Sequence, residues 1–175
     1  AENFAESLYV DCFMNLNSKK NESYLGSILV SHLLYKSYPA IIKLQTFLER
    51  AFEISKLNIV DINVAIFDFF LNVVNSNDKF LTPQLIDKAF NCLITSIKQI
   101  NDCDELLKIL KKLITKVDVD LLPLKELLSM IKTLLSLQIE EIENSAFGII
   151  YKLLKRVPKM ELPLQLFSDE KPCKN

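Results

Sequence analysis

The sequence predicts an all-α fold of about eight helices, and three observations lead to this prediction. Hydrophobic residues recur at the three- and four-residue steps of a helix almost throughout the chain, and strict alternation over the length of a strand is absent. Hydrophobic residues make up 50% of the 175 residues, too large a share for a disordered chain. The chain contains only two glycines, whereas an all-β protein needs a turn residue about every 8–12 positions.

Breaks in the hydrophobic spacing delimit the first four helices. Polar residues 17–21 separate the first helix from the second. Pro39 is expected to start the third, because a proline in the first helical turn removes no intrahelical hydrogen bond. We expect these helices at residues 2–16, 22–36, 39–55 and 60–75.

The fourth helix is hydrophobic around most of its circumference, which predicts a buried position at the centre of the core. One narrow polar strip interrupts it at steps of three and four residues. The strip consists of Asp61, Ala65, Asp68, Asn72 and Asn75.

Capping signals delimit the last four helices. Thr82 is expected to cap the fifth helix, with Pro83 at its first position, and Asp102 begins a capping-box pattern before the sixth. The eighth helix carries glutamates in its first turn and basic residues in its last, an arrangement that the helix dipole favours. We expect these helices at residues 82–97, 102–117, 123–135 and 140–156.

The prolines indicate how the helices are organised. Pro39, Pro83, Pro123 and Pro163 are separated by 44, 40 and 40 residues, and each precedes or opens a hydrophobic run. Two-helix repeats of the HEAT and armadillo type have periods of about 40–47 residues. The spacing therefore predicts four consecutive helical hairpins.

Residues 121–128, Leu-Leu-Pro-Leu-Lys-Glu-Leu-Leu, resemble the first helix of a HEAT repeat, although the second helices lack the Asp and Arg positions typical of HEAT units. The resemblance implies a divergent HEAT- or armadillo-like protein whose four hairpins stack as a short α-solenoid. The alternative is a compact, irregular helical bundle, of which the eight-helix apoptosis-regulator type is one variant. We expect residues 1–157 to form one domain, and residues 158–175 to be a polar C-terminal tail or part of a next repeat.

The search for catalytic or metal-ligating patterns gives a negative result. His32 is the only histidine, lies among hydrophobic residues, and has no nucleophile elbow near it, so we expect it in the core. No pair of cysteines has Cys-x-x-Cys spacing, so we expect free thiols. The cysteines are Cys12, Cys92, Cys103 and Cys173. We therefore predict that the protein is not an enzyme and needs neither a cofactor nor a metal.

The two glycines stand alone within helical patterns, so neither belongs to a phosphate-binding loop. A glycine in a helix costs about 1 kcal/mol relative to alanine. Gly26 and Gly148 are therefore each expected to mark a close neighbouring helix, and for Gly148 a ligand groove is the alternative.

Basic residues concentrate in the second half of the chain. Residues 1–87 carry 7 basic and 10 acidic side chains, and residues 88–175 carry 14 and 12. Lysines recur on one side of the sixth and of the eighth helix, and in an α-solenoid such second helices line one concave groove. The residues expected to line a basic groove are Lys108, Lys111, Lys112, Lys116, Lys152, Lys155 and Arg156.

A groove of this kind predicts a non-catalytic protein–protein interaction module, a scaffold or adaptor that binds a protein or peptide with acidic and hydrophobic features. The alternative is an RNA-binding repeat domain, although aromatic residues for base stacking are not interleaved with the lysines. The longest hydrophobic run, residues 62–74, is shorter than the roughly 20 residues of a membrane span. We expect an intracellular protein, and a homodimer through an exposed end of the array is compatible with this interpretation.

Overall fold

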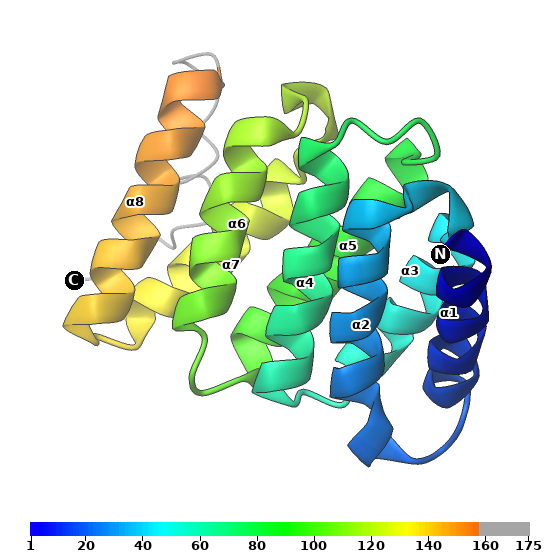
Figure 1. Cartoon of the computed structure of the whole chain (residues 1–175). Helices are drawn as coiled ribbons and strands as arrows, with labels where there is room; N and C mark the ends of the chain where they lie inside the picture. The colour runs from blue at the N-terminus through cyan, green and yellow to red at the C-terminus, as the bar shows by residue number, and fades with distance from the viewer. Residues whose placement is uncertain (158–175) are drawn as a thin grey trace, which may run out of the picture.

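The computed structural model describes residues 1–157, and all regular structure in this part of the chain is helical (Figure 1). The α-helices within it are α1 (Glu2–Leu16), α2 (Tyr24–Ser37), α3 (Leu44–Ser55), α4 (Val60–Asn75), α5 (Pro83–Gln99), α6 (Asp104–Lys116), α7 (Leu124–Ser136) and α8 (Glu140–Arg156). Short 3-10 helices precede α2, α3 and α7, namely η1 (Asn21–Ser23), η2 (Pro39–Ile41) and η3 (Val119–Leu121). The predicted tail or partial repeat at 158–175 lies outside the described residues.

The eight predicted helices are confirmed. The larger differences lie at their starts, and their ends agree to within two residues. Thr82 caps α5 as expected, because its Oγ1 accepts a hydrogen bond from the backbone N–H of Leu85 at 3.2 Å. The expected start of α3 at Pro39 is wrong. Pro39 opens η2 instead, and extended backbone at Ile42 delays the start of α3 to Leu44.

The capping box expected at Asp102 does not form. Helix α6 begins at Asp104, and its N-cap residue, Cys103, makes no side-chain hydrogen bond to the first turn. Asp104 and Glu105 lie in that turn, where the helix dipole favours negative charge. The acidic residues therefore favour the helix start by charge and not by a capping hydrogen bond.

The helices are arranged in two rows (Figure 1). Helices α2, α4, α6 and α8 contact one another in that order, as do α1, α3, α5 and α7, and the two helices of each consecutive pair are also in contact. Helices α1 and α8 lie at opposite ends of the array. Helix α4 contacts α2, α3, α5 and α6, whereas the main contacts of α8 among the described helices are with α6 and α7.

The same helical plan occurs twice, with an offset of 80 residues. Helix η2 begins at residue 39, α3 at 44 and α4 at 60; η3 begins at 119, α7 at 124 and α8 at 140. The turns agree as well: Asn58 and Gln138 both have φ of 57°, and in each turn an isoleucine is the N-cap of the second helix. In residues 39–75 and 119–155, the elements thus start at equivalent positions, and their ends agree to within one residue.

Helix α4 forms the centre of the core, as predicted. Ten of its sixteen residues are buried. Phe69 stacks on Phe47 of α3 with ring centroids 4.8 Å apart, and Phe67 stacks on Phe52 at 6.1 Å. Asp61 and Asp68 of the predicted polar strip are exposed, whereas Ala65 is buried.

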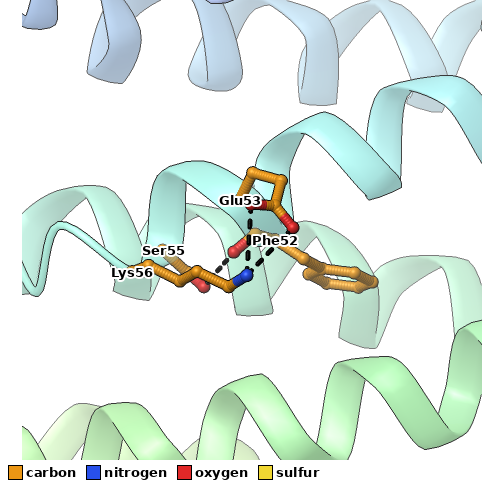
Figure 2. A network of polar contacts seen from close by, with 4 residues as sticks. All are labelled: Phe52, Glu53, Ser55 and Lys56. Atoms are coloured by element: carbon orange, nitrogen blue, oxygen red, sulfur yellow. Dashed lines mark hydrogen bonds and ion pairs between the residues drawn. The ribbon is translucent and has the colours of Figure 1, made fainter.

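Asn63 is a buried polar residue of α4 that the hydrophobic pattern did not single out. Its Nδ2 donates to the backbone carbonyl of Ser55 and to Oγ of Ser96, both at 2.9 Å. The amide thereby joins the end of α3 to α5. Figure 2 shows the end of α3, where Ser55 Oγ donates to the carbonyl of Phe52 at 2.5 Å and Lys56 Nζ lies 3.0 Å from Glu53 Oε1.

Candidate functional site

A basic hollow of about 290 Å³ lies between α6 and α8, which are neighbours in the same row (Figure 1). We call it the lysine hollow. It is lined by Lys108, Lys111, Lys112 and Thr115 of α6 and by Lys152 of α8. The structure thus brings together four of the seven predicted site residues and adds Thr115.

The sequence of α6 places its lysines on one side because the other side is taken up by the core. Six of its residues are buried: Leu106, Leu107, Ile109, Leu110, Leu113 and Ile114. Residues three and four apart in a helix share a face. Lys108, Lys111, Lys112 and Thr115 occupy the remaining face, and the adjacent α8 contributes Lys152 beside them.

Gly148 gives Lys111 the space to lie across α8. A Cβ atom built on Gly148 would be 2.8 Å from Lys111 Nζ and 3.0 Å from its Cε. The expected close neighbouring helix at Gly148 is therefore not confirmed, because the nearest atoms belong to a lysine side chain of α6 and not to a helix backbone. The same expectation for Gly26 is wrong, because nothing lies within 4 Å of a Cβ built there.

The other three predicted residues do not line the lysine hollow. Lys116 lies in the last turn of α6 and is exposed. Lys155 is placed with its Nζ 4.7 Å from the centroid of the Tyr151 ring. Arg156 donates through Nη1 to the backbone carbonyls of Ile114 and Val117, so it closes the C-terminal end of α6.

One ion pair reduces the charge of the lysine hollow. Lys108 Nζ lies 3.1 Å from Glu105 Oε1, and both side chains are largely exposed to solvent. An exposed pair of this kind contributes about 0–1 kcal/mol and opens easily. Within residues 1–157, Lys111, Lys112 and Lys152 have no carboxylate within ion-pair distance.

His32 is part of the core, as predicted. Its ring centroid lies 5.0 Å from that of Phe69. Burial lowers the pKa of His32, and the nearby charge of Lys36 lowers it further, against smaller opposing effects of Asp68 and Asn72. The imidazole is therefore largely neutral at pH 7, and it packs on the ring of Phe69 in a buried site.

The described cysteines are free thiols. Cys12 and Cys103 are buried and Cys92 is half-buried, and burial raises the pKa of all three. They are therefore protonated at neutral pH and weak as nucleophiles. Across residues 1–157 no three His, Cys, Asp or Glu side chains are grouped closely enough to hold a metal ion. Cys173 lies outside the described residues.

Comparison with protein-family models, with curated protein sequences and with solved structures gives no match to this chain. In the part of the chain from Ala1 to Val157, no helix combines the length and the hydrophobicity that crossing a membrane requires.

Proposed function

We propose that this chain is a non-catalytic protein-interaction module that binds an acidic peptide segment in the lysine hollow. The observation that supports this proposal is the convergence of Lys108, Lys111, Lys112 and Lys152 from two helices on one concavity. The fold holds the four lysines close together although they repel one another. A negatively charged partner relieves this repulsion, so the cluster attracts such a partner and raises its rate of association.

The proposed architecture is a short HEAT- or armadillo-like α-solenoid of four stacked hairpins. Two findings support it. Helices of each row contact one another in chain order, and residues 39–75 have the same helical plan as residues 119–155. Stacked repeats contact their sequence neighbours in this way, and their extended surfaces commonly bind other proteins.

Neighbouring helices in the row that contains the lysine hollow indicate which partner sequence would fit. Helix α4 exposes Asp61 and Asp68, and α2 exposes Leu29 and Leu33. A peptide crossing this row would meet lysines on α6 and α8, carboxylates on α4 and leucines on α2. The best partner is therefore acidic where it contacts α6 and α8, carries no acidic residues over α4, and is hydrophobic over α2.

RNA is the weaker candidate because no aromatic ring lines the lysine hollow. Proteins that bind single strands stack bases on rings, at about 1–3 kcal/mol per base. Tyr151 is the nearest aromatic residue in sequence to Lys152, but its ring lies against Lys155, outside the lining of the hollow.

The test is a titration with two labelled probes, an acidic peptide of alternating Asp and Glu about twelve residues long and a single-stranded RNA of similar length. The double variant Lys112→Glu, Lys152→Glu is expected to bind the peptide at least about tenfold more weakly than the wild type. Lys125→Glu, on the other row of helices, is the matched control and should leave the affinity unchanged.

Thermal unfolding should show that both variants remain folded. Lys112 and Lys125 are exposed and Lys152 is half-buried, and charge changes at the surface usually alter stability by less than about 0.5 kcal/mol. Equal peptide affinity of the wild type and the double variant would refute the site. Tight RNA binding with a steep loss in salt would replace the peptide proposal with the RNA alternative.

A further inference from the structure

Helix α8 exposes a row of hydrophobic side chains along its outer side. Phe147, Tyr151 and Leu154 are 55%, 56% and 40% exposed. They follow one another at steps of four and three residues, so they form one continuous stripe. Exposed aromatic rings in a line mark a surface suited to contact with another protein.

At the equivalent positions of α4, the hydrophobic side chains are buried. Positions 147, 151 and 154 correspond, at the offset of 80, to Phe67, Leu71 and Val74 of α4. These three residues are 0%, 6% and 8% exposed. Helix α4 has α6 beyond it in its row, whereas α8 has no such neighbour among the described helices. Among residues 1–157 the stripe of α8 is therefore uncovered, and a helix placed beside α8 would bury it.

Charges at the two ends of the stripe indicate what that helix is. Glu143, Phe147, Tyr151 and Lys155 lie four residues apart on one ridge of α8, with an acid at one end and a base at the other. Glu143 and Lys155 are about 18 Å apart along the helix axis, too far to pair within one chain. Neither has an ion-pair partner among residues 1–157.

We propose that two copies of this chain associate through antiparallel contact of their α8 helices. A two-fold axis between Phe147 and Tyr151 places Phe147 of one copy against Tyr151 of the other, and Glu143 against Lys155. Each contact then occurs twice, as the symmetry of an isologous interface requires. The ridge is complementary to itself only in the antiparallel direction, because a parallel pair would place Glu143 beside Glu143 and Lys155 beside Lys155.

The association is expected to be weak, because a single pair of helices buries less surface than the roughly 1,200–2,000 Å² of a stable complex. We therefore expect a dissociation constant of about 10–100 µM, as for a transient contact. The lysine hollow uses Lys152 and not Lys155, so the dimer and the peptide site can be tested separately.

The experiment is sedimentation equilibrium of the 175-residue chain from about 5 to 500 µM, a range that brackets the expected dissociation constant. Glu143→Lys and Lys155→Glu each place two like-charge pairs in the dimer. Each is expected to raise the dissociation constant at least about tenfold. Phe147→Ser should weaken the dimer further, and Phe4→Ser, an exposed aromatic on α1 at the opposite end of the array, is the matched control.

An equimolar mixture of the Glu143→Lys and Lys155→Glu chains gives the decisive result. Neither variant associates well with itself, but in a mixed dimer both charged contacts are attractive again. The mixture should therefore dimerise about as well as the wild type. Only a two-fold contact between these two positions predicts this rescue.

Two outcomes would overturn the proposal. A mixture that stays monomeric where the wild type dimerises would exclude the antiparallel contact. A wild-type chain that is monomeric up to the highest concentration would exclude the dimer. In that case, loss of folding stability in Phe147→Ser would assign the stripe to a contact within the chain, with residues 158–175 as the candidate.

Discussion

Arg50 in α3 donates its Nε proton to the backbone carbonyl of Leu16, the last residue of α1, at 2.6 Å. The terminal carbonyls of a helix have no partner within the helix, and a charged donor from a neighbouring helix is a strong substitute. Arg156 does the same for the end of α6. The two arginines of the chain thus both close the C-terminal end of another helix.

Replacing Arg50 by methionine is expected to lower the free energy of unfolding by about 1.5–3 kcal/mol, because a buried carbonyl loses a charged donor. Urea denaturation would measure this loss. Lys19→Met, which removes a cation from the exposed loop after α1, should change the free energy of unfolding by less than about 0.5 kcal/mol. Equal effects of the two changes would show that the hydrogen bond to Leu16 contributes nothing.

Gly148→Ala tests the position of Lys111. Alanine has the higher helix propensity, by about 1 kcal/mol, and the atoms that it would meet are the flexible end of a lysine. We expect the variant to be more stable by about 0.5–1 kcal/mol but to bind the acidic peptide more weakly, since Lys111 must move. Gly26→Ala should raise stability equally without changing peptide affinity. Destabilisation by Gly148→Ala would show that Lys111 cannot move aside.

Asn63→Ala removes the amide that joins α3 to α5. The change leaves the hydroxyl of Ser96 without its donor in the core, whereas the carbonyl of Ser55 still accepts from the backbone N–H of Asn58 at 3.1 Å. The expected cost is therefore about 1–2 kcal/mol. Ser96→Ala removes one of the two bonds and should cost about 1 kcal/mol. The double variant should then be less destabilised than the sum of the two single changes. Additive losses would indicate that the two side chains act independently.

His32 is expected to make stability depend on pH. Its folded pKa is below its ordinary value of 6.5, so the unfolded chain binds a proton more readily than the folded protein does. Stability is therefore lost as the pH falls from above 6.5 towards the lower folded pKa. In His32→Gln, the difference in unfolding free energy between pH 7.5 and pH 5.5 should be smaller than in the wild type. An unchanged difference would assign the pH dependence to other groups.

Gln138 and Asn58 offer a matched pair of turn positions, because both have φ of 57°. Asparagine adopts this left-handed conformation more readily than glutamine. Gln138→Gly should therefore stabilise the protein by about 0.5–1 kcal/mol, and Asn58→Gly by less. A larger gain at Asn58 in thermal unfolding would contradict this order.

Hydrophobic spacing was sufficient to predict the helices, because a buried face repeats every three to four residues whatever its neighbours are. The spacing of the prolines indicated a regular period, but their structural positions are not equivalent. Pro39 opens η2, Pro83 is the first residue of α5, and Pro123 precedes α7. The offset of 80 residues appears in the starts of the helices and not in the positions of these three prolines.

The candidate site was predicted in part for a related reason. Helical phase alone places Lys108, Lys111 and Lys112 on one side of α6. Lys155 and Arg156 follow Lys152 by three and four residues, but adjacent helix positions differ in direction by about 100°. Which of them points towards α6 depends on how α6 and α8 pack against each other, and the sequence of α8 alone does not show this packing. Asn63 was missed because a short polar side chain within a hydrophobic helix gives no signal before its partners are known.

Helix α4 contacts two helices of its own row and two of the other, so it is the hardest helix to separate from the rest of the array. Amide protons of α4 can exchange with solvent only when its neighbours separate, which requires nearly global unfolding. Helices α1 and α8 can detach with fewer losses, because each has neighbours on one side only. Amide hydrogen exchange should therefore be fastest in α1 and α8 and slowest in α4. The exchange rates of α4 would then measure the free energy of unfolding of the whole domain.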